Sequence, residues 1–469
     1  MESQSTYDII VIGSGPGGYI AAIRAAQLGY KTAIVEKYKT LGGTCTNVGC
    51  IPAKALLDST EHYHAAITKF KAHGIDINSM SLNFEQMINR KSEVVAQNVS
   101  GLNYLMKKNK IEVLQGTATF INNKEINIVN RETTNKVSAK WFIIATGSKP
   151  SSIKGVEIDK QRIITSTESL SLKEKPNSMV IIGGGVVGVE MASVFARIGV
   201  KVTILEYADS LIPTMDRDLG KELNKVLAKE GIDIQLSHKV QSAQNNGENV
   251  TVKYLDSKNN PNEITADYCL VAVGRKAYTV GLGLENTKIE TDEQGRIKTN
   301  EKLQTAEENI YAIGDVIKGP MLAHKAEEEG VFVVETINGQ KPHINHNLIP
   351  GVVYTWPEVA SVGATEEELK AQGSEYHVGK FPFMASGRAR AAMESDGFVK
   401  VLTDPKYGEI LGVHIIGPRA ADLIAQPVIS MHYETTDEDM FRISYAHPTY
   451  SEALKEAYLI ASGQGALNL

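Results

Sequence analysis

Two copies of one strand–turn–helix–strand pattern constrain the fold of this 469-residue chain more than any other feature. The first copy has an apolar strand at 7–12, a glycine turn at 13–18, an Ala-rich helix and a second strand that ends at Glu36. The second copy repeats this order, with a glycine turn at 183–188 and a strand that ends at Glu206. In both copies the acid follows the last glycine by 18 residues. The turn glycines are Gly13, Gly15, Gly18, Gly183, Gly185 and Gly188.

Each copy predicts a dinucleotide site, because glycines let the backbone approach a pyrophosphate at the N-terminus of the helix. The acid at the end of the second strand can accept a hydrogen bond from a ribose hydroxyl. In the second copy Glu206 stands where a 2′-phosphate would require a basic residue, which favours NAD over NADP. Two copies predict two nucleotide ligands, the alternative being that the second copy is a relic without a ligand.

Two cysteines five residues apart follow the first copy, in the segment 42–54. A disulfide needs Cα atoms within about 7 Å, whereas five residues of ideal helix rise about 7.5 Å and turn the side chains apart. Cys45 and Cys50 can therefore be bridged only where a helix is distorted or has not begun, and Gly49 suits such a distortion. Because so short a loop gains little stability from a cross-link, a bridge here favours redox chemistry. The alternative is two unrelated buried cysteines.

Composition narrows the class of protein. Cys269, the third and last cysteine, falls in an apolar run that predicts a buried strand. So few cysteines exclude a disulfide scaffold and fit a reducing compartment, where a redox pair is usually catalytic. The net charge of −6 without a basic block argues against a nucleic-acid partner, and no apolar run is long enough to span a membrane. The start of the chain shows no targeting segment, which predicts a cytoplasmic protein; a mitochondrial matrix location would require a removed transit segment.

The remaining pattern predicts an α/β chain with two doubly wound dinucleotide-binding domains and a C-terminal α+β domain. Helices are expected at 51–70 and 84–109, short strands between 111 and 129, and a strand at 141–147. In the C-terminal part we expect strands at 350–362, 378–383, 397–402 and 408–416 and helices at about 420–433 and 451–461. The predicted parts are residues 1–149, 150–276, 277–347 and 348–469.

Polar residues in two segments can be interpreted either as structural or as functional. Asp315 ends an apolar strand and precedes a helix near Pro320, so it could cap that helix or bind a sugar hydroxyl. Thr449 and Glu452 have the spacing of a capping box, with His447 as a surface residue. The functional alternative is a His447–Glu452 pair in which the carboxylate orients the imidazole for proton transfer.

Taken together, these motifs resemble the flavin-dependent pyridine nucleotide–disulfide oxidoreductases. The resemblance covers essentially the whole chain and rests on the double dinucleotide fold together with Gly-Gly-Thr-Cys45-x4-Cys50-Ile-Pro-x-Lys54, Ala-Thr-Gly147, Ile-Gly-Asp315 and His447-Pro followed by Glu452. Within the family, the chain is most similar to members that oxidise a dihydrolipoyl group on a carrier protein.

The resemblance implies two cofactors and a homodimer, with no metal. FAD would contact Gly13, Gly15, Gly18, Glu36, Lys54, Gly116, Thr146, Gly147 and Asp315. NAD would contact Gly183, Gly185, Gly188, Glu206 and Gly274. Glu190 would pair with Lys54 beside the flavin. The parts named above become an FAD-binding domain, an NAD-binding domain, a central second part of the FAD domain, and a C-terminal dimerisation domain.

The resemblance also implies the chemistry. Cys45 would exchange disulfides with the substrate and Cys50 would face the flavin, while His447, held by Glu452, would move protons in the active site of the other subunit. The carrier would be the acyltransferase subunit of a 2-oxoacid dehydrogenase complex or a lipoyl carrier protein of glycine cleavage. The alternatives are a glutathione-reductase-like enzyme, which Glu206 disfavours, and a non-catalytic flavoprotein that docks on a complex.

Four positions depart from the usual pattern of the family. They are Tyr445, Ala277, Tyr278 and Trp356. None of them replaces a reacting group. We therefore expect them to affect rates or nicotinamide affinity rather than the type of reaction.

Overall fold

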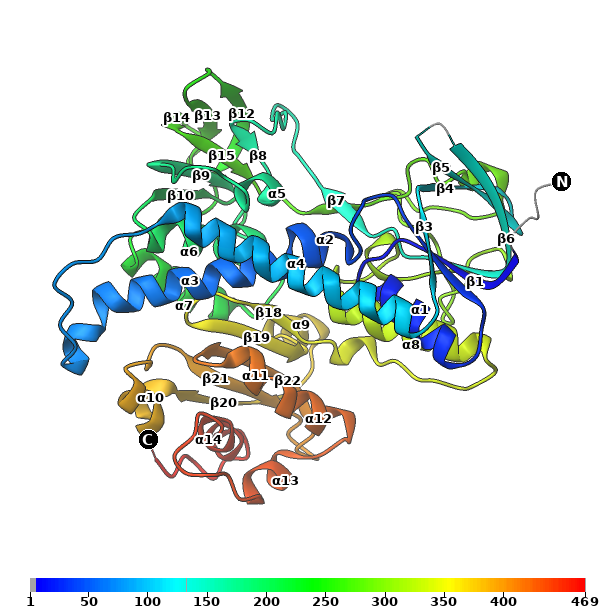
Figure 1. The fold of residues 1–469 in the computed structure, drawn as a ribbon. Coiled ribbons are helices and arrows are strands. Elements are labelled where there is room, and N and C mark those ends of the chain that lie inside the picture. The colour runs from blue at the N-terminus through cyan, green and yellow to red at the C-terminus, as the bar shows by residue number, and fades with distance from the viewer. Residues whose placement is uncertain (1–5, 132, 469) are drawn as a thin grey trace. The chain divides into compact units, whose positions relative to one another are not determined.

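The computed structural model describes residues 6–131 and 133–468, and these form two compact units (Figure 1). The first unit comprises the chain up to Ala55 together with 89–151 and 274–344. The second comprises 56–88, 152–273 and the chain from Asn345 onward. Within the described residues, no helix combines the length and apolarity needed to cross a bilayer. The finer four-part division expected from the sequence stays a prediction.

A seven-stranded sheet forms the centre of the first unit, in the order β3-β2-β1-β6-β5-β4 with β17 beside β6. Strand β1 pairs in parallel with both β2 and β6, while β4, β5 and β6 are antiparallel. The strands are β1 (Thr6–Ile12), β2 (Thr32–Glu36), β3 (Glu112–Gln115), β4 (Thr117–Asn122), β5 (Glu125–Asn130), β6 (Thr133–Ile144) and β17 (Ile310–Ala312). Residues 9–12 of β1 and all of β2 are buried, which fits the apolar runs at 9–12 and 33–35 in the sequence.

Helices α1 (Pro16–Gln27) and α8 (Ala323–Ile337) pack against each other in this unit. Their backbones approach closely, since a Cβ on Gly17 would lie 2.7 Å from the carbonyl oxygen of Ala326, and one on Gly330 2.7 Å from that of Gly17. The unit also contains α2 (Gly43–Val48), the start of α3 (Cys50–Thr68), most of α4 (Phe84–Lys108), β7 (Ser148–Pro150) and β16 (Arg275–Ala277).

The second copy of the repeat builds a parallel sheet in the second unit, in the order β11-β10-β9-β15-β8. Its strands are β11 (Asp233–Gln235), β10 (Lys201–Leu205), β9 (Ser178–Ile182), β15 (Tyr268–Val271) and β8 (Ile163–Ile164). Its helices are α6 (Val186–Arg197) and α7 (Arg217–Lys229), and a separate antiparallel sheet contains β12 (Lys239–Asn245), β13 (Val250–Leu255) and β14 (Pro261–Ala266). Cys269 is fully buried in β15, which confirms the prediction for this residue. The expected α/β class with two doubly wound repeats is therefore confirmed.

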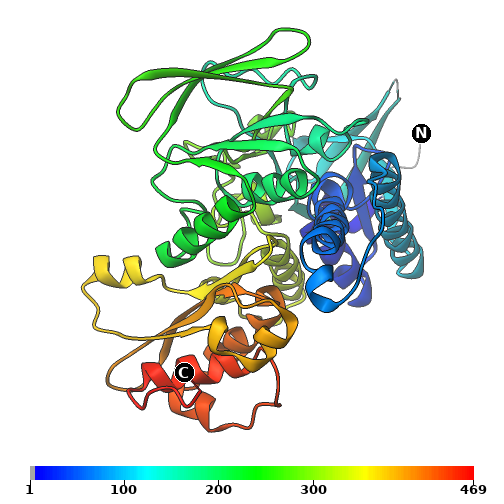
Figure 2. The same cartoon turned by 90° about the vertical axis from the view of Figure 1, so that its left-hand side faces the viewer.

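The C-terminal part of the second unit is an antiparallel sheet in the order β18-β19-β22-β21-β20 (yellow to orange in Figure 2). Its strands are β18 (Gly351–Val353), β19 (Glu358–Gly363), β20 (His377–Pro382), β21 (Phe398–Thr403) and β22 (Ile410–Gly417). Its helices are α9 (Glu366–Gln372), α10 (Gly387–Ala392), α11 (Ala420–Leu423), α12 (Ala425–His432), α13 (Asp437–Arg442) and α14 (Glu452–Ala461). This arrangement confirms the predicted α+β character.

The single helix expected at 420–433 is wrong, because α11 ends at Leu423 and α12 begins at Ala425. Pro427 explains the interruption. Proline lacks an N–H and is tolerated in the first turn of a helix but not in its interior, so the helix restarts just before it.

A buried ion pair holds the segment that carries Asp315. Lys325 and Glu329 of α8 are each 1% exposed, and Nζ lies 2.8 Å from Oε1. Glu329 accepts the N–H of Gly314 at 2.7 Å, and Lys325 donates to the carbonyl oxygen of Gly314 at 3.3 Å. Asp315 follows in a 3-10 turn, Gly314–Val316, whereas α8 is capped at Leu322. The helix-capping alternative for Asp315 is therefore excluded.

We predict that Lys325→Met lowers the free energy of unfolding of the holoenzyme by about 3–5 kcal/mol, because the buried carboxylate of Glu329 loses the ammonium group that balances its charge. Lys298→Met is the matched control, since Lys298 and Glu290 form a pair of similar length, 3.0 Å, that is exposed to solvent. The control should lose at most about 1 kcal/mol. Urea titration followed by circular dichroism measures both, and equal midpoints for the two variants would contradict the assignment.

Candidate functional site

The two glycine turns have the same geometry. Gly13 has φ +104° and Gly183 φ +107°, a region that L side chains rarely adopt. A Cβ on Gly13 would lie 2.4 Å from the carbonyl oxygen of Ala145, and one on Gly183 would lie 2.5 Å from that of Ala272. A Cβ on Gly18 or Gly188 would lie 1.9 Å from the carbonyl oxygen of the first glycine of its own turn. Packing of the protein itself therefore requires these four glycines.

The middle glycine of each turn is different. Gly15 and Gly185 precede the helices α1 and α6 with ordinary φ values of −64° and −76°. A Cβ on either residue would meet no protein atom within 4 Å. The fold does not need glycine there, whereas a pyrophosphate at the N-terminus of the helix would come within contact of any side chain. Both turns therefore fit a dinucleotide.

The two acids tie each turn to the end of the second strand. Glu36, 5% exposed, accepts the N–H and the hydroxyl of Ser14 at 3.1 and 2.6 Å and the N–H of Tyr38 at 2.8 Å. Glu206, 8% exposed, accepts the N–H groups of Gly184 and Ala208 at 2.5 and 2.6 Å. Because a carboxylate has about four lone-pair sites, both acids retain capacity for a ribose hydroxyl.

Asp315 belongs to a polar chain in the first unit. Ser148 donates its hydroxyl to Asp315 at 2.5 Å, and Arg275 donates through Nε to Ser148 Oγ at 2.7 Å and through Nη2 to the carbonyl oxygen of Ser148 at 2.8 Å. Burial lowers the pKa of Arg275, while the charges of Asp315 and Cys50 act in the opposite direction. Sequence reasoning missed Ser148 and Arg275, although they stand next to Gly147 and Gly274, which it selected.

Thr146 and Gly147 are held by Tyr278, one of the departures from the family pattern. Thr146 donates its hydroxyl to the carbonyl oxygen of Tyr278 at 2.7 Å, and the N–H of Tyr278 donates to Gly147 at 2.9 Å. The ring of Tyr278 lies between Lys37 and Lys149, whose Nζ atoms are 3.8 and 4.0 Å from its centroid. Burial acts to raise the pKa of Tyr278, but the two ammonium groups outweigh it and lower that pKa.

The two remaining glycines that were predicted to contact a cofactor, Gly116 and Gly274, differ in the protein atoms that surround them. A Cβ on Gly116 would lie 2.7 Å from the carbonyl oxygen of Val129, so packing between strands explains this glycine. A Cβ on Gly274, φ +105°, would meet no protein atom within 4 Å. Gly274 falls in the first unit, whereas the glycine turn at 183–188 falls in the second.

The two cysteines meet at a break between helices. Helix α2 ends at Val48, Gly49 leaves the helical conformation with φ −141° and ψ −114°, and α3 begins at Cys50. A Cβ on Gly49 would lie 2.9 Å from the carbonyl oxygen of Thr44, so the chain folds back tightly over Cys45. Both cysteines are half-buried, and their side chains share a hydrogen bond. The predicted interruption of the helix is confirmed.

Charged and phenolic groups surround this pair in the first unit. The hydrogen bond with Cys50 and burial raise the pKa of Cys45, and the carboxylate of Glu327 acts in the same direction. Tyr19 of α1 donates its hydroxyl to Glu327 of α8 at 3.3 Å. Lys54, one helical turn after Cys50, lowers the pKa of Cys45 through its charge. Sequence reasoning selected Lys54 but missed Tyr19 and Glu327.

His447 and Glu452 form a hydrogen-bonded pair in the second unit. His447 Nδ1 lies 2.8 Å from Oε1 of Glu452, and Oε2 accepts the N–H of Thr449 at 2.8 Å. The capping-box alternative is wrong, because α14 is capped at Ser451 without a side-chain hydrogen bond and the Thr449 hydroxyl donates to Ala446 instead. The His447–Glu452 pair is the alternative that the structure contains. Burial acts to raise the pKa of Glu452, but the hydrogen bonds from Thr449 and His447 lower it. The imidazole side chain is 80% exposed, which leaves Nε2 accessible to a substrate.

Glu190 is the last of the predicted site residues, and Tyr445 is one of the departures from the family pattern. Glu190 in α6 is 4% exposed and accepts the N–H of Tyr354 at 3.0 Å. Its pairing with Lys54, which belongs to the other unit, stays a prediction. Tyr445 directs its hydroxyl inward, where the atom is buried without a hydrogen-bond partner among the described residues, and burial raises the pKa of Tyr445 to about 12.

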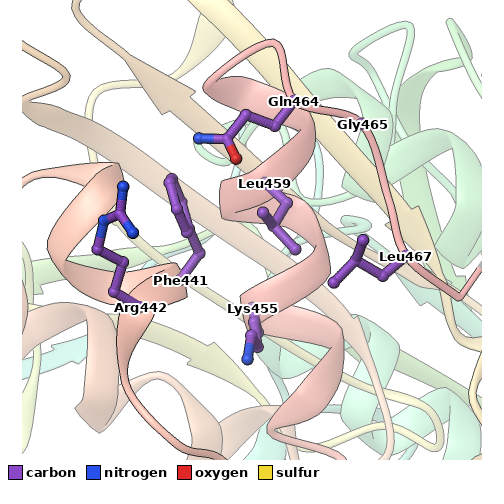
Figure 3. A pocket seen from close by; sticks show the side chains of 7 residues that line it. All are labelled: Phe441, Arg442, Lys455, Leu459, Gln464, Gly465 and Leu467. Carbon is purple, nitrogen blue, oxygen red and sulfur yellow. The ribbon is translucent and has the colours of Figure 1, made fainter.

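A cavity of about 470 Å³ lies among α13, α14 and the tail that follows α14 (Figure 3). It is lined by Phe441, Arg442, Lys455, Leu459, Gln464, Gly465 and Leu467. None of the predicted site residues lines it, so this cavity is not the candidate site. Among the described residues, no group of three or more His, Cys, Asp or Glu side chains is placed to hold a metal ion.

Comparison with known proteins places the chain in one family. The family model described as "Pyridine nucleotide-disulphide oxidoreductase" matches residues 7–330, and that of the dimerisation domain of the same family matches 349–458. The chain therefore belongs to the pyridine nucleotide–disulphide oxidoreductases, whose members use FAD and NAD. Its C-terminal part is a dimerisation domain, which supports a homodimer.

Individual relatives are similar over nearly the whole chain. It is 46% identical to "Dihydrolipoyl dehydrogenase, mitochondrial" from Pisum sativum over 96% of this chain and 90% of that protein. It is also 46% identical to the protein of the same name from Schizosaccharomyces pombe, over 97% of this chain and 90% of that protein. Among solved structures, the Cu(II) complex of the HOCl-induced flavoprotein disulfide reductase RclA from Escherichia coli matches with a TM-score of 0.88 and 28% identity, covering 97% and 100% of the two chains.

We predict that Gly185→Ala raises the Michaelis constant for NAD(H) at least about tenfold and leaves folding and FAD content unchanged, because the new methyl group meets only the pyrophosphate. Gly15→Ala should instead reduce FAD content and leave the second repeat intact. Gly183→Ala is the contrasting variant, since its Cβ would clash with Ala272 and should damage folding. Thermal unfolding, flavin absorbance and steady-state kinetics separate these effects. Normal NAD(H) kinetics in Gly185→Ala would refute the assigned role.

Proposed function

We propose that this chain is a dihydrolipoyl dehydrogenase, which oxidises a dihydrolipoyl dithiol to its disulfide and passes two electrons to NAD. The observation that supports this most directly is the hydrogen-bonded Cys45–Cys50 pair at the break between α2 and α3. It occurs in a chain that is 46% identical to enzymes named dihydrolipoyl dehydrogenase. Two thiols within hydrogen-bonding reach of each other suit disulfide exchange.

The first repeat, together with Asp315, Thr146, Gly147, Gly116 and Lys54, would hold FAD. The second repeat, together with Gly274, would hold NAD. When bound, the flavin supplies the hydride chemistry that connects a dithiol with a nicotinamide. The supporting observation is the open space beside Gly15 and Gly185, together with the acids Glu36 and Glu206 at the matching strand ends.

Proton transfer and disulfide exchange follow from the remaining residues. His447 accepts a proton from one substrate thiol, and the resulting thiolate attacks Cys45 of the oxidised pair. The Cys45–Cys50 bond breaks, a mixed disulfide forms between substrate and Cys45, and Cys50 leaves as a thiolate. The second substrate thiol attacks the substrate sulfur of the mixed disulfide, which releases the cyclic disulfide, and its proton passes to the departing sulfur of Cys45. The two electrons now held by the cysteines reduce NAD, and the charge of Lys54 favours the thiolate form of the pair.

The pairing of subunits would bring these groups together. The dimerisation domain carries His447 on an exposed loop, with Glu452 fixing Nδ1 and Nε2 accessible. We infer that His447 and Glu452 of one subunit serve the cysteines of the other. Glu190 would pair with Lys54 beside the flavin.

The partner would be a lipoyl-carrying acyltransferase subunit of a 2-oxoacid dehydrogenase complex or a lipoyl carrier protein. The relatives from Pisum sativum and Schizosaccharomyces pombe are named as mitochondrial. We propose that the protein works in the compartment of its lipoyl carrier, which is the mitochondrial matrix or, as the sequence predicts, the cytoplasm. Both compartments keep thiols reduced, which fits an exchangeable pair.

We predict that His447→Gln lowers dihydrolipoamide oxidation by a factor of about 10² to 10⁴, the usual contribution of a positioned acid–base group. FAD content should stay normal, because His447 lies on the dimerisation domain rather than in either glycine turn. NADH formation at 340 nm measures the turnover. Near-normal turnover would remove His447 from the mechanism.

A second prediction concerns the choice of nucleotide. Glu206→Gln keeps a carbonyl oxygen that can accept the N–H of Gly184 but removes the negative charge that opposes a 2′-phosphate. The ratio of kcat/KM for NAD to that for NADP should fall roughly tenfold, the effect of about 1.4 kcal/mol. Steady-state kinetics with both nucleotides provides the ratio, and an unchanged value would be inconsistent with the proposed role of Glu206.

A further inference from the structure

The loop that carries His447 lies between α13 and α14 and exposes the imidazole to solvent. An exposed side chain has little packing to fix its position, so its placement depends on the loop backbone and on Glu452. Within the loop, Thr449 donates its hydroxyl to the carbonyl oxygen of Ala446 at 2.8 Å. Contacts between the loop and the rest of the dimerisation domain therefore determine the position of the His447–Glu452 pair.

Tyr450, between His447 and Glu452 in the chain, makes the shortest of these contacts. Its hydroxyl donates to Oε2 of Glu394 at 2.6 Å, a length typical of a hydrogen bond to a carboxylate. Its ring packs edge-on against Phe383, with centroids 6.4 Å apart, and the guanidinium of Arg388 lies 5.1 Å from its centroid. A longer hydrogen bond joins the loop to α12, where Gln426 donates to the hydroxyl of Ser451 at 2.9 Å.

Two of the residues that contact Tyr450 are held by burial or by a backbone hydrogen bond. Phe383 is fully buried in the core of the C-terminal sheet, and the N–H of Glu394 donates to Ala389 at 2.9 Å at the end of α10. Burial and the neighbouring carboxylate raise the pKa of Tyr450 to about 12, so its hydroxyl remains a donor throughout the neutral pH range. The loop is thereby fixed to the segment 383–394, which joins β20 to β21.

We propose that Tyr450 and Glu394 are positioning residues for the His447–Glu452 pair, acting through the loop backbone and not on the substrate. The inference rests on the proposed dithiol oxidation. A displacement of about 1 Å from productive geometry can lower a rate up to about 10²-fold. Loss of the Tyr450–Glu394 hydrogen bond should therefore slow the step that uses His447 and leave the NADH-linked half of the reaction unchanged.

The experiment compares Tyr450→Phe, Glu394→Ala and Glu394→Gln in the full-length holoenzyme. Tyr450→Phe and Glu394→Ala should lower kcat for dihydrolipoamide about tenfold and change its KM less than about twofold. The rate at which NADH bleaches the flavin should be unchanged in both. Glu394→Gln should retain most of the activity, because the amide oxygen still accepts the phenol hydrogen bond. The double variant Tyr450→Phe/Glu394→Ala should be no slower than either single variant.

Tyr376→Phe is the matched control, because Tyr376 donates to Glu366 at 3.0 Å in the same domain and lies outside the His447 loop. Its kcat should equal that of the wild type. Equal kcat values for Tyr450→Phe and Tyr376→Phe would overturn the inference, as would a parallel loss of the NADH half-reaction. If Tyr450→Phe does not fold, equal turnover of Glu394→Ala and Glu394→Gln overturns the inference instead. A wild type without dithiol turnover overturns the proposed function and this inference together, whereas an active wild type isolates the positioning claim.

Discussion

The close approach of backbone to backbone at the glycine turns is the constraint on which the rest of the structure depends. In each repeat, the first glycine of the turn lies against the end of a neighbouring strand. The last glycine of the turn lies against the carbonyl oxygen of the first glycine. This packing puts the N-terminus of a helix at the edge of a parallel sheet, and a buried acid then closes the turn from the second strand. Because the arrangement occurs twice, the chain has two turns that fit a dinucleotide, and the proposed redox and acid–base pairs would act in relation to them.

The groups proposed to react are held in two contrasting ways. Cys45 and Cys50 are half-buried at a break between helices, where Gly49 folds the chain back and fixes one sulfur near the other. His447 is exposed and depends on Glu452 and on the loop that Tyr450 fixes to Glu394. A buried pair suits electron transfer out of contact with water, whereas an exposed imidazole suits a site completed by a second subunit and a substrate carried on another protein.

Features that depend on local spacing could be predicted from the sequence, and those that depend on distant contacts could not. The strand–turn–helix repeats, the acids at positions 36 and 206 and the broken helix at Gly49 follow from residues within one short segment. The Ser148–Arg275–Asp315 chain joins three segments that are far apart in sequence. The Lys325–Glu329 pair could not be predicted from the sequence. Two charged residues one helical turn apart usually indicate a helix face that is exposed to solvent, whereas here both side chains are buried. Tyr450 belongs to no motif that local spacing would reveal, because its partner Glu394 lies 56 residues earlier.

The most direct test of the central claim is an anaerobic titration of the oxidised holoenzyme with dihydrolipoamide, followed by acid quenching, thiol alkylation and mass mapping of the cysteines. The account predicts that the first equivalent converts both Cys45 and Cys50 to alkylatable thiols and leaves Cys269 unchanged as an internal reference. Addition of NAD should then return the pair to a disulfide and produce one NADH per subunit. If Cys45 and Cys50 do not change their oxidation state while NADH is formed, the electrons follow another route and the account is wrong.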